Sequence, residues 1–267
     1  MKLHGLIAEY ETFTSQNDLE IVGLPQGLEI SGLSFDSRNV KAGNLFFCIS
    51  GELYDGHEYA HQALEAGAAA VVVERELNIP IPQIIVQDTR EAMGYFSCIF
   101  FEFPSKEIKV VGVTGTNGKT TTVQLITGIL NSSGVLSQSI GTLTGPLTTP
   151  EAPDLQSKFR ALANSGVATV VMEVSSHALS QHRTTGTEFD IGVFTNLSHD
   201  HLDYHTDINE YFETKCSLFT SDRCRAAVIN TDDPYGSRLA EQVEIKSVEV
   251  SRRGIELVSE SFTGTTL

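Results

Sequence analysis

The first third of the chain alternates short apolar runs with longer segments in which apolar residues recur every three or four positions. Strand-like runs lie at residues 45–49, 70–73 and 83–86, and helical patterns lie at residues 58–67 and 90–101. This alternation predicts a compact α/β unit. Residues 104–107 interrupt the apolar pattern, and a new series of strands begins at Ile108. We therefore predict two domains, residues 1–103 and residues 104–267.

The second region alternates strand and helix patterns more strictly. Strands are expected at residues 109–113, 135–140, 167–174, 189–195, 226–229 and 245–250, and helices at residues 120–131, 154–164, 208–219 and 235–242. Apolar, β-branched strands that alternate with helices predict a mostly parallel sheet with helices on both faces. Ligands of such sheets bind at the carboxyl ends of the strands.

Composition narrows the class of protein. A chain of 267 residues with 40% hydrophobic residues can bury a sizeable core, but a net charge of −16 with only 18 Lys and Arg argues against a general nucleic-acid-binding role. The four cysteines form no C-x-x-C pair, which indicates reduced thiols and neither zinc nor disulfides. The N-terminus is too polar for a signal peptide, and no apolar run approaches the ~18 residues of a membrane span. We expect a cytoplasmic protein.

A phosphate-binding loop is predicted at residues 114–122 (TGTNGKTTT), directly after the Val-rich run. Gly115 and Gly118 free backbone N–H groups to converge on phosphate oxygens, and the following helix adds its positive N-terminal end. Lys119 supplies an ammonium and Thr120 a hydroxyl ligand for Mg²⁺. The segment therefore predicts binding of ATP or GTP. Its spacing departs from the common pattern, since Val113 stands where the first glycine is usual, and a glycine-rich turn with a purely steric role is the alternative.

A carboxylate and a His-rich loop follow two later strands. Glu173 is the single charged residue of the strand at 167–174, where a buried carboxylate is costly unless it is paired or binds a cation. With Thr120 it could hold Mg²⁺; alternatively it is a structural residue bonded to backbone N–H groups.

Residues 196–205 (NLSHDHLDYH) contain three histidines and two aspartates, which predicts a metal ligand among them. Zinc is conceivable, but the phosphate loop favours Mg²⁺; taken singly, Asp200, Asp203 and His205 are more typical of loop or cap residues.

Lys215 lies in a helical segment, residues 211–219 (YFETKCSLF). From the pattern alone we expect a solvated helical lysine.

Taken together, these motifs resemble the Mur ligases, and within them the MurE type. The resemblance is carried by residues 114–122, by residues 173–179 (EVSSHAL), 181–183 (QHR) and 196–205, and in the N-terminal region by residues 35–38 (FDSR), 41–46 (KAGNLF) and 55–57 (DGH). It covers essentially the whole chain. It implies an N-terminal UDP-muramoyl-peptide-binding domain followed by a central ATPase domain of the phosphate-loop type.

The resemblance implies an ATP-dependent amide ligase of peptidoglycan synthesis, which adds the third amino acid to UDP-N-acetylmuramoyl-L-alanyl-D-glutamate through an acyl phosphate. Carried over to this sequence, the ATP phosphates are cradled by Gly115, Thr116, Asn117, Gly118, Lys119, Thr120 and Thr121. The implied Mg²⁺ ligands are Thr120 and Glu173, joined at a second ion by His201 and by Lys215, which matches a carbamylated lysine. Lys119, Glu173, His201 and Lys215 are the implied catalytic residues.

For the UDP-sugar peptide, the resemblance implies Ser37 near the uridine, and Thr148, Thr149, Ser175, Gln181 and Arg183 toward the sugar and peptide. Arg183 can act as a fork for a carboxylate or phosphate. Serine and threonine also commonly cap helices, and residues 149–151 are compatible with a simple helix start.

The resemblance to Mur ligases also implies a third domain. We expect this chain to lack that domain and the last strands of the central sheet. Two hypotheses follow: a partial ligase, or a stand-alone binding module or pseudoligase with a partner chain that supplies the missing domain. We favour the first, because the residues for ATP, metal and carbamate chemistry are all present. The sequence does not indicate whether meso-diaminopimelate or L-lysine is added, nor the oligomeric state.

Overall fold

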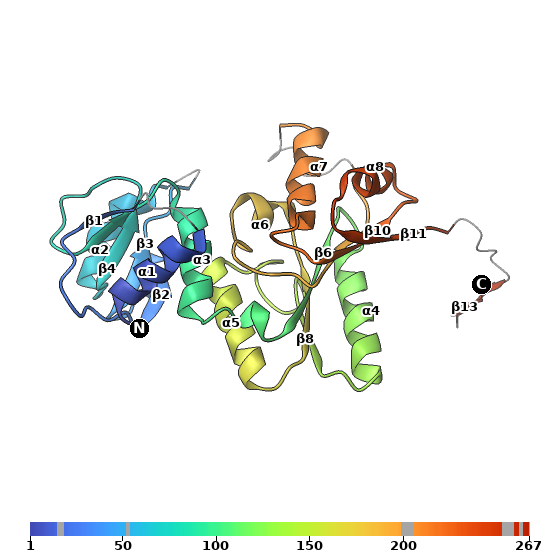
Figure 1. Cartoon of the computed structure of the whole chain (residues 1–267), viewed down its shortest axis with the longest axis horizontal. Helices are drawn as coiled ribbons and strands as arrows, with labels where there is room; N and C mark the ends of the chain where they lie inside the picture. The colour runs from blue at the N-terminus through green and yellow to red at the C-terminus, as the bar shows by residue number, and fades with distance from the viewer. Residues whose placement is uncertain (15–18, 52–53, 199–205, 253–258, 262–263, 267) are drawn as a thin grey trace.

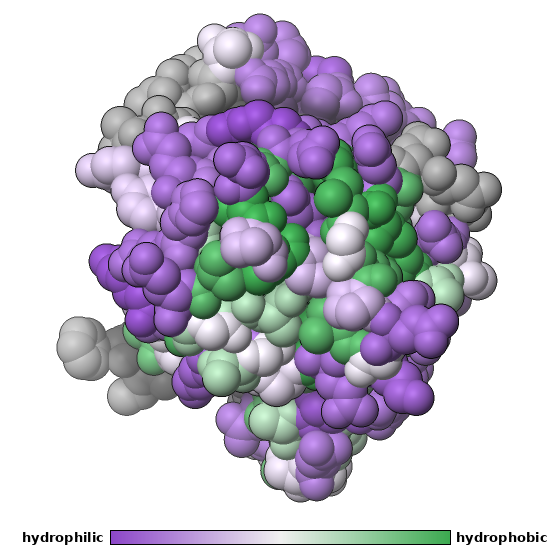
Figure 2. Space-filling model, turned by 90° about the vertical axis from the view of Figure 1, so that its left-hand side faces the viewer, coloured by the Kyte–Doolittle hydropathy of each residue, from purple (hydrophilic) through white to green (hydrophobic). Residues whose placement is uncertain are grey.

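The computed structural model describes residues 1–14, 19–51, 54–198, 206–252, 259–261 and 264–266. A five-stranded sheet with its helices forms one end of the molecule and a six-stranded sheet forms the middle (Figure 1). The helices α3 (Thr89–Phe100) and α5 (Ala152–Asn164) pack side by side between the two sheets. Seen from the N-terminal end, apolar side chains gather in the middle of the face and polar ones surround them (Figure 2).

The N-terminal sheet has the strand order β1-β5-β4-β3-β2. Only the β1–β5 pair is antiparallel. The bounds are β1 (Glu20–Val22), β2 (Gly32–Ser34), β3 (Asn44–Phe47), β4 (Ala70–Val73) and β5 (Gln83–Ile85). Side chains alternate between the faces, as the period of two requires: Leu45 and Phe47 pack with α1 (Leu3–Thr14) and α3, and Phe46 packs with α2 (Ala60–Glu65).

The central sheet is parallel throughout, with the order β11-β10-β9-β6-β8-β7. Its strands are β6 (Lys109–Thr114), β7 (Ser137–Ile140), β8 (Thr169–Glu173), β9 (Ile191–Phe194), β10 (Ala226–Asn230) and β11 (Lys246–Val250). The predicted parallel sheet is confirmed. The chain runs from β6 to the edge strand β7, returns to β8 beside β6, and continues at β9 on the other side of β6. The carboxyl end of β6 therefore lies between those of β8 and β9.

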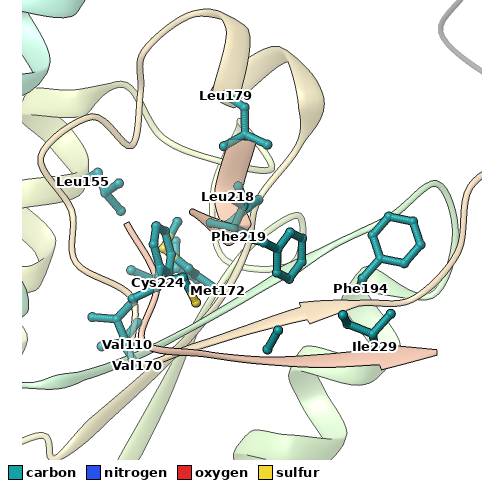
Figure 3. Close-up of a cluster of buried hydrophobic side chains, with 14 of the residues drawn as sticks. Val110, Leu155, Val170, Met172, Leu179, Phe194, Leu218, Phe219, Cys224 and Ile229 are labelled. Carbon is teal, nitrogen blue, oxygen red and sulfur yellow. The ribbon is translucent and has the colours of Figure 1, made fainter. Parts of the chain in front are cut away.

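Helices cover both faces of the central sheet, as predicted. α4 (Lys119–Ser132) packs on one face, where Val123 meets Val111, Val113 and Val171. The other face carries the larger core and is covered by α5, α6 (Ser176–Ser180), α7 (Ile208–Cys216) and α8 (Pro234–Gln242). Figure 3 shows Phe194 and Ile229 on neighbouring strands of this face, with Phe219 and Leu218 from the segment after α7 above the sheet.

The two sheets are connected through η3 (Pro104–Lys106), and the contact is polar as well as apolar. The Arg160 guanidinium donates to the carbonyl oxygens of Phe101 and Glu102, both at 2.9 Å, and pairs with Glu107 at 2.8 Å. The other helical segments are the short 3₁₀ helices η1 (Ser37–Asn39), η2 (Gly56–Tyr59) and η4 (Ser217–Phe219).

Every residue of β11, the last strand in the order of the central sheet, is exposed. The last described residues pair as β12 (Ser259–Ser261) and β13 (Gly264–Thr266). Within the described ranges, no helix combines the length and the apolar character needed to cross a bilayer.

Candidate functional site

The predicted phosphate loop connects the end of β6 to the start of α4. Gly115 has φ +143° and Gly118 has φ +83°, conformations that side chains rarely adopt. A Cβ at Gly115 would also collide with the Thr195 hydroxyl oxygen. Gly118 is the N-cap residue of α4 and provides no side-chain cap, which is typical of helix ends that receive an anion. Both glycines are therefore required by the backbone.

The segment after β9 supports this loop from the neighbouring strand. The N–H groups of Thr116 and Asn117 donate to Asn196, to its carbonyl oxygen at 2.9 Å and its Oδ1 at 3.0 Å. The Thr195 hydroxyl donates to the Asn117 carbonyl at 2.7 Å. Thr195 and Asn196 were not among the predicted site residues, although their place at the end of a parallel strand was the available signal.

Two lysines meet at one carbonyl group of the loop. Lys119 Nζ donates to the Gly115 carbonyl at 2.8 Å and also to the Thr116 carbonyl at 2.8 Å, while Lys215 Nζ donates to the Gly115 carbonyl at 3.2 Å. Lys215 is 1% exposed, and its Nζ lies 4.5 Å from the centre of the Tyr211 ring. The expectation of a solvated lysine is therefore wrong. Tyr211 and Lys215 are four residues apart, so both face the sheet from α7.

Glu173 ends β8 and is 2% exposed. Its Oε2 accepts a hydrogen bond from the Thr120 hydroxyl at 2.9 Å, and its Oε1 accepts one from the Thr142 N–H, also at 2.9 Å. Thr142 follows the end of β7 and was missed by the sequence analysis. Both interpretations of Glu173 thus describe part of its surroundings: it is bonded to a backbone N–H, and it also lies against the hydroxyl predicted to bind Mg²⁺.

One cavity of about 320 Å³ joins most of these groups. Its lining consists of Thr116, Asn117, Gly118, Lys119, Thr120, Thr121, Thr142, Thr148 and Glu173. The Thr148 hydroxyl lies 3.0 Å from that of Thr142. The cavity offers backbone N–H groups, an ammonium, hydroxyls and one carboxylate, a set suited to a polyanion together with a hard cation.

A second cluster contains the remaining predicted residues of the six-stranded sheet. The Thr149 hydroxyl donates to the Glu173 carbonyl at 2.9 Å and accepts from the Ser175 N–H at 3.1 Å, which joins the two clusters. Ser175 Oγ caps α6 by accepting from the Ala178 N–H. Arg183 donates from Nη1 to the Thr149 carbonyl at 3.0 Å and from Nη2 to Gln181 Oε1 at 2.7 Å. Thr149, Ser175, Gln181 and Arg183 thus form one bonded group.

Ser37 lies on the five-stranded sheet unit and lines a different cavity, of about 680 Å³. Its hydroxyl donates to Gln62 Oε1 at 2.9 Å. The cavity is partly aromatic, since Phe35, Phe46, Tyr54 and Tyr59 contribute to its lining. Beside Ser37, the hydrogen bonds from Arg38 lower the pKa of the Asp36 carboxyl. A flat aromatic base is compatible with such a lining.

An ion-paired network lies next to this second cavity. Arg75 donates to Asp55 Oδ2 at 2.6 Å, and this bond holds the pKa of the Asp55 carboxyl far below its usual range. The buried His57 ring binds Asp55 Oδ1 through Nδ1 at 2.6 Å, and its Nε2 accepts from the Glu74 N–H at 2.9 Å. The network fixes the segment that contains Gly56, a lining residue of the cavity.

The predicted ligand His201 lies outside the described residues, as do Asp200, Asp203 and His205. Among the residues that the structure does describe, no three His, Cys, Asp or Glu side chains gather as a metal-binding group. The described cysteines are all free, and Cys48, Cys98 and Cys224 are buried.

Two sequence profiles match the chain. The profile of the Mur ligase middle domain matches residues 113–266, and that of the Mur ligase family catalytic domain matches residues 29–98. This chain belongs to the Mur ligase family. The first profile covers more than half of the chain and contains both clusters around Glu173, while Ser37 lies in the second.

Individual Mur ligases resemble the chain over most of its length. The UDP-N-acetylmuramoyl-L-alanyl-D-glutamate--2,6-diaminopimelate ligase of Geobacter metallireducens is 48% identical over 231 residues, which are 80% of this chain and 45% of that protein. The ligase of the same name from Listeria monocytogenes is 41% identical over 255 residues, 90% of this chain and 50% of its own length. A solved structure of such a ligase has a TM-score of 0.78 at 27% identity and covers 96% of this chain and 58% of the other. The chain thus spans about half the length of the curated relatives it matches.

Proposed function

We propose that this Mur ligase chain is the substrate- and ATP-binding part of a carbon–nitrogen ligase that joins an amino acid to UDP-N-acetylmuramoyl-L-alanyl-D-glutamate. The names of the similar ligases support this substrate and give 2,6-diaminopimelate as the amino acid. In this proposal residues 1–103 bind the UDP moiety and residues 104–267 bind ATP. The free cysteines of the chain, three of them buried, agree with a reducing, cytoplasmic location.

The observation that carries the proposal is the pairing of Thr120 with Glu173 in the cavity beside Lys119. Residues 115–121 would hold the ATP phosphates through backbone N–H groups and the Lys119 ammonium. The hydroxyl of Thr120 and the carboxylate of Glu173 are hard oxygen donors of the kind that bind Mg²⁺, and the bound ion would neutralise phosphate charge. His201 and a carbamylated Lys215 remain the proposed ligands of a second Mg²⁺.

The reaction requires an activated carboxylate. Transfer of the terminal phosphoryl group of ATP to the glutamate carboxylate gives an acyl phosphate and ADP. The incoming amine attacks the carbonyl carbon of the acyl phosphate and loses a proton, and inorganic phosphate leaves. Phosphoryl transfer depends mainly on positioning and charge neutralisation. We propose that Lys119 supplies positive charge for this step. Ser37 is proposed to position the uridine, and the sugar and peptide are assigned to Thr148, Thr149, Ser175, Gln181 and Arg183.

Calorimetric titration of the chain with Mg²⁺-ATP and, separately, with UDP-muramoyl dipeptide tests the proposal. We expect both ligands to bind the wild-type chain. Lys119→Ala should abolish Mg²⁺-ATP binding and leave the dipeptide affinity unchanged, whereas Lys246→Ala, at an exposed position of β11, should alter neither. Unchanged ATP affinity in Lys119→Ala would contradict the ATP site, and absence of dipeptide binding by the wild type would contradict the UDP-substrate site.

A further inference from the structure

Glu151 is a largely buried carboxylate to which the proposed function gives no role. It is the N-cap residue of α5, but its side chain makes no capping bond. Instead, Oε1 lies 2.9 Å from Arg183 Nε, and both side chains are largely buried, with 14% of Glu151 and 13% of Arg183 exposed. A charged pair with so little solvent access is held much more strongly than a surface pair.

The contacts of Arg183 come from three sides. Glu151 lies at Nε, the Thr149 carbonyl accepts from Nη1, and Gln181 Oε1 accepts from Nη2. The hydrogen bonds from Nη1 and Nη2 hold the guanidinium against the loop that carries Thr148 and Thr149, and the Glu151 carboxylate adds an ion-pair contact at Nε. A free arginine side chain loses about 2 kcal/mol of rotamer entropy when it is immobilised on a ligand. An arginine that is already oriented avoids most of this cost.

Glu151 also connects the two sheets. Its Oε2 lies 4.0 Å from Nη1 of Arg90, in the first turn of α3, a helix of the N-terminal unit. One carboxylate thus lies between an arginine of the predicted peptide-binding cluster and an arginine of the unit that carries Ser37.

We propose that Glu151 is a positioning residue that orients Arg183 for an anionic group on the peptide end of the UDP-linked substrate. The inference rests on the proposed function, because it takes the UDP-muramoyl dipeptide as the ligand. Glu151 acts through Arg183 and does not contact the ligand itself. Arg90 contributes more weakly, because its distance to Glu151 is longer.

A double-mutant cycle tests the proposal on the full chain. Glu151→Gln keeps the shape of the side chain and removes its charge, and we expect the calorimetric affinity for UDP-muramoyl dipeptide to fall about tenfold. Arg183→Gln should lose at least as much. If Glu151 acts through Arg183, the double variant binds no more weakly than Arg183→Gln alone. UDP and Mg²⁺-ATP affinities should stay at wild-type values, which a general loss of structure would not allow.

The outcomes separate the inference from the proposed function. Wild-type dipeptide affinity in Glu151→Gln, or additive losses in the double variant, would overturn the role of Glu151 and leave the proposed function standing. If the wild-type chain bound UDP-muramoyl dipeptide no more tightly than UDP, both the role of Glu151 and the proposed function would be overturned. Glu151→Asp provides a second variant: a shorter carboxylate should restore part of the affinity that Glu151→Gln loses.

Discussion

Thr120 and Glu173 are 53 residues apart in the sequence, yet the Thr120 hydroxyl donates to Glu173 Oε2 at 2.9 Å. The parallel sheet is the reason: β6 and β8 are neighbours with Val113 opposite Glu173, so the residues that follow β6 lie next to the end of β8. A hydroxyl at the start of α4 and a carboxylate at a strand end are thereby brought to the same cavity. This pair is the structural basis for the proposed Mg²⁺ site.

Glu173→Gln should weaken Mg²⁺-ATP binding at least about tenfold. Glutamine retains an oxygen for the Thr142 N–H but removes the negative charge that a divalent cation requires. The affinity for ATP in EDTA should not fall, since the carboxylate then only repels the phosphates. Calorimetry with and without Mg²⁺ measures both values, with the exposed Glu9→Gln as the matched control. Equal losses in the presence and absence of Mg²⁺ would argue for a purely structural Glu173.

Gly115→Ala should prevent nucleotide binding and reduce the free energy of unfolding by about 2 to 4 kcal/mol. The φ of +143° is unfavourable for alanine, and its Cβ would overlap the Thr195 hydroxyl, so the loop must move. Gly128→Ala is the matched control: it is an exposed position of α4 where a Cβ meets nothing within 4 Å, and it should raise stability by about 0.5 to 1 kcal/mol. Urea unfolding and ATP titration of both variants provide the comparison. Normal ATP affinity in Gly115→Ala would show that the loop does not require glycine.

The elements with strong periodicity were predictable from the sequence. β4 was predicted at its observed bounds, because its apolar run stops at Glu74, and α8 within one residue, because Pro234 marks its start. The helix α1 was not predicted, although Leu3, Leu6, Ile7 and Tyr10 form a helical apolar stripe. The short strands β1 and β2 were also missed, because such strands depend on their partners in the sheet.

The candidate site was predictable only where chemistry and strand ends coincide. Glu173 was found because a charge at the end of an apolar strand is costly. The burial of Lys215 could not be found from its helix, since the hydrogen bond to Gly115 spans 100 residues. Thr142 and Glu151 were missed for a similar reason: their roles are fixed by neighbours from other strands and helices, and threonine or glutamate in a loop carries no local signal.

Lys215 should form a carbamate with CO₂. Its near-complete burial beside Lys119 places two ammonium groups at one carbonyl, and replacing one of them by an anion reduces their repulsion. The neutral amine attacks CO₂, which forms the N–C bond and releases a proton. Carbon-13 NMR after incubation with labelled bicarbonate should show a carbamate resonance that is lost in Lys215→Arg and retained in the exposed Lys246→Arg. A resonance that persists in Lys215→Arg would assign the carbamate elsewhere.

Asp55→Asn should change how stability depends on pH. The bond from Arg75 is the main cause of the lowered pKa of the Asp55 carboxyl in the folded chain. The ionised carboxyl therefore stabilises the fold fully above its ordinary pKa of about 3.9, and this stabilisation is lost as the pH falls through the lower pKa of the folded chain. At pH 7 we expect the free energy of unfolding of Asp55→Asn to be about 1 kcal/mol lower than that of the wild type. The effect is modest because the ion pair is partly exposed. Below pH 4 the difference from wild type should shrink. Urea unfolding at several pH values measures both curves, with the exposed Asp222→Asn as control. A difference that stayed constant down to pH 2 would mean that the variant disturbs packing around His57 and not the ion pair.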